Sequence, residues 1–258
     1  MFKHSLAVYL LIIMTITAIT AQPRNQRDAA GLRQGLWEAV DNRGMPVFRG
    51  YFKDDKPVGE MMRFFPNGEI RAIMYYVENS ELVRARFFWQ ADKVAAQGNY
   101  ISTKRDSIWN FYRDNGTLST REEFSEGKRN GIEQKFYQNG INVAEEINWI
   151  DDTKEGVWKQ FYNNGLPKLL ANYSNGVLVG AFASWYPNGH KELEGYYDNG
   201  LAQGDWKRYD ENGDFLATIK YEDGVILNIE ELEKAGIILN LHEPREFIPE
   251  RTIEDLFR

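Results

Sequence analysis

Residues 184–200 read SWYPNGHKELEGYYDNG and contain two Asn-Gly pairs that lie eleven residues apart, each preceded by aromatic residues. Asn-Gly is a strong signal for a two-residue β-hairpin turn, because both residues tolerate the positive φ that a type I′ turn requires. The stretch therefore predicts two tight turns joined by short strands. Whether the pattern recurs along the chain decides the fold.

The first of these turns does recur, at intervals of 24 or 25 residues with one double interval of 48. A degenerate copy centred on Asp92 fills the double interval, so the sequence predicts eight units of about 24 residues. The glycines at the second turn position are Gly44, Gly68, Gly116, Gly140, Gly165, Gly189 and Gly213.

Three positions of the unit are mainly aromatic. Seven residues before the turn glycine stand Trp37, Met61, Trp109, Trp158, Phe182 and Trp206, with Glu133 as the exception. Four residues before it stand Val40, Phe64, Phe88, Tyr112, Phe136, Phe161, Trp185 and Tyr209. Eight residues after it stand Phe52, Tyr76, Tyr100, Phe124, Tyr173, Tyr197 and Tyr221, and Trp149 follows one residue late in the fifth unit.

Each unit is therefore expected to form strand, turn, strand and turn. The second strand alternates cleanly in LPKLLANY, which predicts a sheet with one buried face. The first strand is less regular, because Trp158 and Phe161 are three residues apart and an ideal strand would place them on opposite faces. Either a bulge re-aims one of them or both faces carry aromatic side chains.

The predicted fold class is all-β: tandem antiparallel β-hairpin repeats that form an elongated, twisted single sheet over residues 35–228. A lone hairpin is barely stable in water, so each unit needs its neighbours to cover its aromatic side chains. Residues 22–34 are predicted to be a flexible leader. In the C-terminal cap and tail, 229–258, Ile229–Ala235 predicts a short helix that Gly236 ends. The tail from Ile237 is expected to pack on the array or to bind a partner.

Residues 1–21 are predicted to be a secretory signal peptide. Lys3 precedes an uncharged, mainly apolar run from Leu6 to Ala21, and the small Ala21 suits cleavage. A retained membrane anchor is the alternative, but the run is short for a span of roughly twenty residues. We therefore expect an exported protein, periplasmic or extracellular. The whole chain contains no Cys, so an exported form would depend on its core rather than on disulfides.

The net charge of the chain affects which partners it can bind. The net charge of the 258-residue chain is −7, and loss of Lys3 with the signal peptide makes it more negative. This balance disfavours binding to nucleic acid or to anionic membranes. Apolar content of 43% and charged content of 27% are typical of a folded protein.

The pattern G-x-W-x-x-[FY]-Y-x-N-G, followed by an aromatic residue and a second glycine turn, resembles the MORN repeat. It is most similar to the bacterial variant found in tandem in exported or toxin-neutralising proteins. The best copies are GVWKQFYNNG at 156–165, GAFASWYPNG at 180–189 and GDWKRYDENG at 204–213. The chain lacks the His-Gly-x-Gly end of the eukaryotic unit. The resemblance implies an elongated antiparallel sheet that works as a scaffold or docking surface.

No residue set predicts catalysis, a cofactor or a metal site. The predicted mature chain has two histidines, His190 beside a turn and His242 in the tail, and no Gly-x-Ser-x-Gly motif. Asp210, Asn212 and Asp214 have the spacing that opens an EF-hand, but Phe215 and Tyr221 stand where that loop needs Gly and Glu. We predict a hairpin turn there instead and a protein that is not an enzyme.

The aromatic positions are the candidate binding residues, although they can equally be the core of a one-layer sheet. Exposed Trp and Tyr on a rigid sheet stack on sugar rings or anchor a protein partner. The function predicted is a non-catalytic exported scaffold for protein–protein interaction in the cell envelope. The alternatives are an envelope carbohydrate or peptidoglycan binder and a toxin-neutralising protein. The residues concerned are Trp109, Trp158, Trp185, Trp206, Tyr173, Tyr197 and Tyr221.

Overall fold

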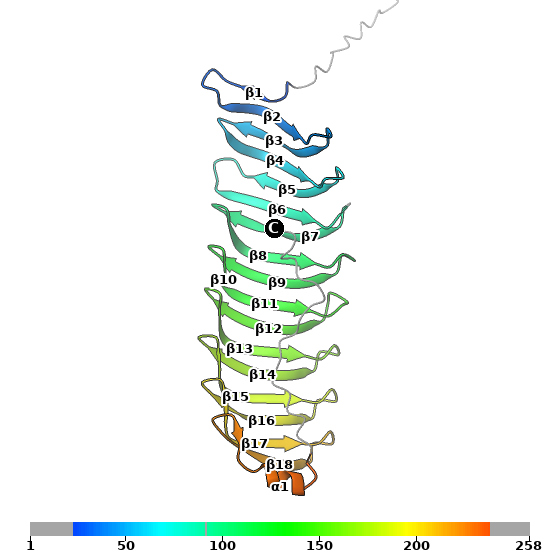
Figure 1. Ribbon diagram of the computed structural model, residues 1–258, viewed down its shortest axis with the longest axis vertical. Helices are drawn as coiled ribbons and strands as arrows, with labels where there is room; N and C mark the ends of the chain where they lie inside the picture. Colours follow the sequence, from blue (N-terminus) through cyan, green and yellow to red (C-terminus); the bar gives the residue numbers. More distant parts are fainter. Residues whose placement is uncertain (1–22, 91, 238–258) are drawn as a thin grey trace, which may run out of the picture.

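The computed structural model describes residues 23–90 and 92–237, which form one elongated sheet with a short helix at its C-terminal end (Figure 1). The predicted signal peptide and the tail beyond Ile237 lie outside the described residues. The elements are β1 Gln26–Arg27, β2 Arg33–Val40, β3 Pro46–Lys53, β4 Lys56–Phe64, β5 Ile70–Tyr76, β6 Leu82–Phe88, β7 Val94–Ile101, β8 Lys104–Tyr112, β9 Leu118–Ser125, β10 Lys128–Arg129, β11 Gly131–Phe136, β12 Val143–Ile150, β13 Thr153–Phe161, β14 Pro167–Ser174, β15 Val177–Trp185, β16 Lys191–Asp198, β17 Leu201–Tyr209, β18 Phe215–Glu222, β19 Val225–Ile226 and α1 Ile229–Lys234.

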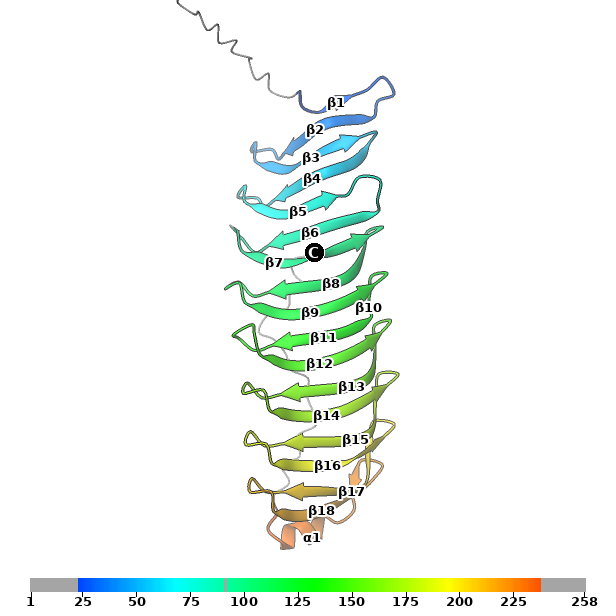
Figure 2. The same ribbon diagram turned by 180° about the vertical axis from the view of Figure 1, so that it is seen from behind.

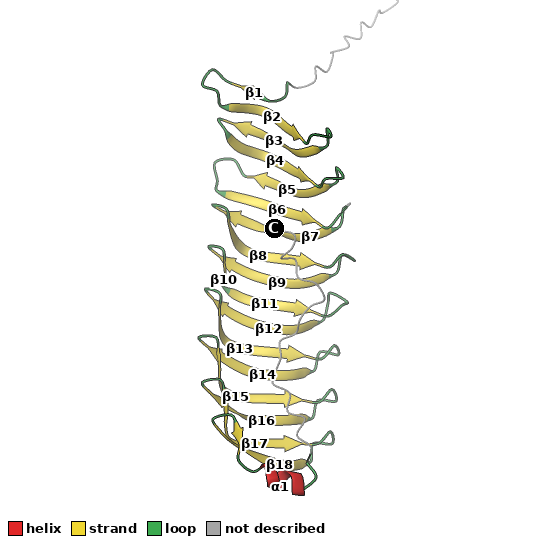
Figure 3. Cartoon of the chain, viewed as in Figure 1, coloured by secondary structure: helices red, strands yellow, loops and turns green. Residues whose placement is uncertain are grey.

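The strands follow one another along the long axis in chain order (Figures 1 and 2). Each pairs antiparallel with its neighbour in the sequence. In the fifth unit β10 and β11 both pair with β9, as two pieces of one interrupted strand. Figure 3 shows strands and turns throughout the array, with α1 as the helical element. The predicted hairpin array in a single sheet with a helical cap is confirmed.

The degenerate third unit is present as the hairpin β6–β7. Asp92 takes the place of the turn glycine and adopts its positive φ, at 67°. The backbone N–H of Trp89 donates to the Lys93 carbonyl at 2.9 Å, and this bond closes the hairpin as in the neighbouring units. The sheet therefore contains eight hairpin units, with the third bending at an aspartate.

The two turns of each unit differ, and the prediction that both are type I′ is wrong for the first. In the turn Tyr186–Gly189, Gly189 has φ 90° whereas Asn188 is not among the positive-φ residues. The Gly189 N–H donates to the Tyr186 carbonyl, and the Tyr186 N–H to the His190 carbonyl, both at 2.9 Å. This is a type I turn followed by a glycine bulge, in which Pro187 suits the second position.

The second turn of the unit does match the prediction. Asn199 and Gly200 both have positive φ, at 47° and 83°. Equivalent turns hold Asp54–Asp55 and Asp151–Asp152, also with positive φ at both residues. Asn and Asp tolerate the left-handed region better than other side chains with a Cβ, which explains their use here.

A bulge near the start of the first strand aims the aromatic side chains. Gly180 has φ 75° inside β15, and the register with β14 shifts between Leu170 and Asn172. Beyond the bulge the strand alternates regularly: in β13, Trp158 and Gln160 are buried while Lys159 between them is exposed. Phe161, one residue after Gln160, therefore belongs to the opposite face. Aromatic side chains therefore occur on both faces, and the register with β14 also shifts between Gln160 and Phe161, where the sequence allowed a bulge.

The N-terminal edge of the sheet is covered by the segment that the sequence predicts as a flexible leader. β1 pairs with β2, and the Asn25 carboxamide lies beside Glu38 of β2. It accepts the Glu38 N–H at 2.9 Å and donates to the Glu38 carbonyl at 3.1 Å. Asn25 thus replaces a missing peptide group along an edge that would otherwise be open to strand addition.

The C-terminal edge is closed in the same way. The Asn228 carboxamide accepts the Lys220 N–H at 2.9 Å and donates to the Thr218 carbonyl at 3.0 Å, both on β18. The helix α1 then packs Leu232 against the last hydrophobic cluster. Both ends of the array are therefore capped, as a stack of repeats requires.

Candidate functional site

One face of the sheet, the core face, holds a row of aromatic rings in two clusters. Trp109 and Trp158 are 0% exposed, and Trp206 is buried as well. The Trp206 ring lies 5.1 Å from Tyr197 and 5.5 Å from Tyr221, between centroids. Trp158 lies 5.6 Å from Tyr173 in the same manner. Because these rings pack on one another across neighbouring units, they form the core of the protein.

Trp185 is separated from the other candidates. It stands at the position equivalent to Phe161, on the opposite face, and is half-buried. We call this opposite face the outer face. The structure therefore brings five of the seven predicted residues together in one cluster, namely Trp158, Trp206, Tyr173, Tyr197 and Tyr221. Trp109 belongs to a second cluster, and Trp185 lies on the other side of the sheet.

Glycines let the tryptophan rings lie flat on the neighbouring strand. A Cβ on Gly195 would stand 2.1 Å from the Trp206 ring, and one on Gly98 would stand 2.3 Å from the Trp109 ring. Neither glycine has a positive φ. Their role is to leave space, so the sheet backbone itself forms the floor under each ring.

A buried charged cluster interrupts the aromatic row in the middle of the core face. Glu133 occupies the position that holds Trp in other units, and it accepts the Trp149 indole N–H at 2.8 Å. The Lys135 ammonium donates to the fully buried Glu145 at 2.7 Å and lies 3.6 Å from Glu133. Gln160 donates to the second oxygen of Glu145 at 2.7 Å. Buried carboxylates are stable only when paired and hydrogen-bonded in this way.

Glu122 borders this cluster and is the carboxyl group most affected by it. Burial, and then the nearby Glu133 charge, raise the pKa of Glu122 from 4.5 to about 7. Arg129, Arg105 and Lys135 oppose the shift but do not cancel it. Glu122 therefore changes its charge near neutral pH, which is unusual for a glutamate.

Basic side chains lie over the aromatic rings of the core face in three successive units. Arg105 lies 5.2 Å from the Trp109 centroid, and Arg129 lies 3.6 Å from the Trp149 centroid. The Lys154 ammonium lies 5.1 Å from the Tyr173 centroid. All three basic residues occupy the same position of the repeat. Cation–π contacts of this kind contribute about 0.5–2 kcal/mol each.

The outer face, in contrast, presents apolar and aromatic side chains to solvent at repeated positions. Ile108, Ile132 and Val157 hold the same position in three successive units and are 49%, 46% and 44% exposed. Tyr51, Tyr75 and Tyr196 share a second position and are also exposed. Sequence reasoning did not single out these residues, because their exposure depends on which face the bulge glycines select.

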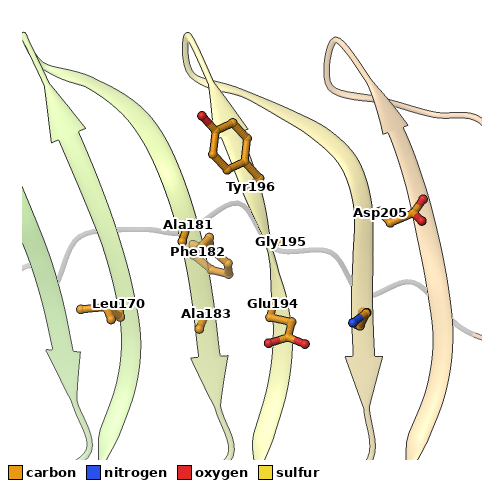
Figure 4. Close-up of a pocket in the computed structure, with 9 residues that line it drawn as sticks. Leu170, Ala181, Phe182, Ala183, Glu194, Gly195, Tyr196 and Asp205 are labelled. Atoms are coloured by element: carbon orange, nitrogen blue, oxygen red, sulfur yellow. The ribbon is translucent and has the colours of Figure 1, made fainter.

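Two shallow hollows lie on the outer face, four units apart. One, of about 390 Å³, is lined by residues of β14–β17, among them Leu170, Tyr196, Glu194 and Asp205 (Figure 4). Its floor is Gly195. The other, of about 440 Å³, has Gly98 at the equivalent place. Its lining combines aromatic, basic and amide groups, namely Tyr75, Arg84, Arg86, Gln97, Asn99 and Asn110.

Comparison with known protein families matches three stretches of the chain to the MORN repeat variant, at residues 57–78, 154–177 and 178–199. Each begins near the start of the first strand of a hairpin unit and ends at the second turn. The chain is a MORN-like repeat protein. A search of the curated proteins found no match. MORN repeats are in general non-enzymatic modules that bind proteins or membranes.

A row of hydrogen bonds at the first turn joins the third to eighth MORN-type units, each to the next. The Tyr162 hydroxyl donates to the Trp185 carbonyl at 2.6 Å, one unit further on. The hydroxyl groups of Tyr137 and Tyr186 make the equivalent bonds. Trp89 and Arg113 hold the same position in earlier units and also donate to the next unit. The residue before the turn is therefore a connector between repeats.

The stretch with EF-hand-like spacing is a hairpin turn, as predicted. Asp210 accepts the backbone N–H groups of Asn212 and Asp214, both at 2.9 Å, and the second of these bonds most strongly lowers the Asp210 pKa. His190 also lies at a turn, with Nδ1 2.9 Å from the Glu211 carbonyl, and His242 lies outside the described residues. In residues 23–90 and 92–237, no group of three or more His, Cys, Asp or Glu side chains is placed to hold a metal ion. The same residues include no helix with the length and apolar character needed to span a membrane.

Proposed function

We propose that this MORN-like protein is a non-catalytic, exported scaffold that binds a protein partner through the outer face of its sheet. The observation that carries the proposal is the row of half-exposed Ile108, Ile132 and Val157 at one position of successive units. Two strands separate successive members, so they recur about every 9.6 Å along a rigid surface. An extended apolar row with exposed tyrosines beside it is typical of a protein-binding surface.

Export to the cell envelope is supported by the sequence of residues 1–21. The charge of −7 favours a protein partner over nucleic acid or an anionic membrane. The partner would contact the outer face, because the tryptophans of the core face are already buried in the protein itself.

Affinity capture from the cell envelope of the source organism tests the proposal, with the mature chain as bait. The variant Ile132→Lys places a charge in the centre of the apolar row, and we expect it to lose the captured protein. Val225→Lys is the matched control, because Val225 is exposed at the C-terminal end of the array, away from the row. Equal capture by wild type and Ile132→Lys would refute the proposed surface.

A carbohydrate ligand is the second candidate, and the hollow at Gly98 favours it. Tyr75 lies there beside Arg84 and the amides of Gln97 and Asn99, and a tyrosine ring with amide donors is suited to a sugar. We expect retention on insoluble cell-wall material to be lost in Tyr75→Ala and kept in Ile132→Lys. Retention that is unchanged by Tyr75→Ala would reject this candidate.

A further inference from the structure

The apolar row of the outer face ends in opposite charges. Its members stand eight residues before the turn residue of each unit, and from the third to the eighth unit this position holds Arg84, Ile108, Ile132, Val157, Ala181 and Asp205. Arg84 and Asp205 are exposed. Within residues 23–90 and 92–237, neither of these two side chains has an ion pair or a hydrogen bond. Each end of the row therefore carries a charge that no described residue neutralises.

The two hollows of the outer face show the same opposition of charge. The charged residues that line the hollow at Gly98 are Arg84, Arg86 and Glu60, and those that line the hollow at Gly195 are Glu194, Asp205 and Lys207 (Figure 4). The first hollow is therefore positive on balance and the second is negative. Lys207 lies directly across from Glu194 in the register of β16 and β17, so a positive group that approaches Lys207 also approaches a carboxylate.

The row is symmetric about its middle, apart from the sign of the charge at each end. A two-fold axis parallel to the strands, midway between Ile132 and Val157, would reverse the direction of the array and keep each position along the strand. It would bring Ile132 opposite Val157 of a second copy, and Arg84 opposite Asp205 of that copy. Because a two-fold interface makes every such contact twice, all four charged ends would find a partner.

The side chains also match in size and the surface is large enough. The same axis would bring Ile108 opposite Ala181 of the second copy, and Ala181 and Ala183 line the hollow at Gly195 (Figure 4). Two sheets that pack face to face lie about 10 Å apart with their strands aligned to about 30°. The row is about 48 Å long and the strands are about 26 Å long, so each copy offers about 1,200 Å². A stable complex buries about 800 Å² per partner.

We propose that the partner of the outer face is a second copy of this chain, packed outer face to outer face and running in the opposite direction. Arg84 of each copy meets Asp205 of the other, and the apolar positions between these two contacts exclude water. The inference rests on the proposed protein-binding function of the outer face and identifies the partner.

Charge reversal in the mature chain tests this pairing, with the dimer dissociation constant measured by sedimentation equilibrium. Wild type should be a dimer. Arg84→Glu and Asp205→Arg should each weaken the dimer by about tenfold or more, because like charges then face each other at both ends. The double variant should return to within about threefold of wild type. An equimolar mixture of the two single variants should do the same, because the two reversed groups meet in one contact and the native Arg84 and Asp205 meet in the other.

Arg63→Glu is the matched control. Arg63 is an exposed arginine two residues after the buried Met61 of β4, so it lies on the core face. Its reversal should leave the dissociation constant unchanged.

The possible outcomes separate this inference from the proposed function. A dimer that survives both single reversals, or that neither the double variant nor the mixture restores, would overturn the pairing of Arg84 with Asp205. A wild-type chain that stays monomeric at about 100 μM would overturn the second copy as partner. The proposed function would then still stand if Ile132→Lys loses a different captured protein, and it would fail as well if capture by Ile132→Lys equals that by wild type.

Discussion

Replacing Glu122 by Gln should stabilise the protein at neutral and alkaline pH. Gln keeps the size of the side chain and removes its charge. Burial and Glu133 raise the pKa of Glu122 to about 7 in the folded protein, against 4.5 for an ordinary glutamate. The ionised form is therefore disfavoured by folding, and the unfolded chain releases this proton at a lower pH.

The sign and size of the effect follow from these two pKa values. Below about pH 4.5, Glu122 is protonated in both the folded and the unfolded protein and does not change the folding free energy. Above about pH 7 it is ionised in both, and its full destabilising effect is present. Each pKa unit corresponds to about 1.4 kcal/mol, so the cost is about 1 kcal/mol at pH 5 and about 3 kcal/mol at pH 8. These are upper limits, because the half-buried carboxylate keeps part of its hydration. Glu122→Gln should gain this amount relative to wild type.

Urea unfolding at pH 5 and pH 8 measures the gain, and a carbon-detected NMR titration of the Glu122 carboxyl measures its pKa directly. Glu123→Gln is the control, since Glu123 is the next residue of β9 and belongs to the opposite face. At pH 8, Glu122→Gln should stabilise the protein more than Glu123→Gln does. The reasoning fails if Glu122 titrates near 4.5, or if Glu122→Gln is no more stabilising at pH 8 than at pH 5.

Three further substitutions test the repeat architecture by chemical unfolding and light scattering. Tyr162→Phe should cost about 1–2 kcal/mol, because the Trp185 carbonyl loses the hydroxyl 2.6 Å away. Gly195→Ala should cost about 1–3 kcal/mol, because its Cβ would meet the Trp206 ring at 2.1 Å. Asn228→Ala should cost about 1–2 kcal/mol by freeing the edge of β18, and should promote concentration-dependent association.

Each of these has a matched control in the same array. Tyr196→Phe removes a hydroxyl from an exposed ring and should be nearly neutral. Gly189→Ala adds a Cβ that meets only ordinary contacts, so it should show the strain of φ 90° alone, about 1–2 kcal/mol. Asn212→Ala alters a carboxamide that bonds within its own turn, and the protein should stay monodisperse. For Tyr162→Phe and Asn228→Ala, an equal loss in the variant and its control would contradict the contact assigned to that variant.

The unit length, the number of units and the sheet could all be predicted, because they depend on local signals. Turn glycines and aromatic positions repeat within 24 or 25 residues, and even the third unit keeps its place through Asp92. The type of each turn was harder to predict. Tyr186-Pro187-Asn188-Gly189 and Asp198-Asn199-Gly200-Leu201 contain the same dipeptide, yet the surrounding residues make the first a type I turn with a bulge and leave the second as type I′.

The assignment of side chains to faces could not be predicted from the alternation alone. A positive-φ glycine such as Gly180 inserts a bulge, and one inserted residue exchanges the two faces of a strand. Trp158 and Trp206 are consequently buried while Tyr196 is exposed. The hydrogen bonds between units could not be predicted either. The acceptor of Tyr162 lies in the next unit, and it can be identified only once the strand register is known. Glu133 was seen as an exception, but its partners Trp149 and Lys135 emerged only from the folded sheet.

The amide caps of Asn25 and Asn228 have a consequence for how such an array changes length during evolution. A duplicated unit inserted in the interior receives a paired strand on each side and leaves both termini as they were. A unit appended beyond either asparagine would have to displace a fitted side chain and would leave its own last strand bare. Growth and shrinkage of this protein are therefore expected by internal gain or loss of whole hairpins, with the two terminal segments inherited unchanged.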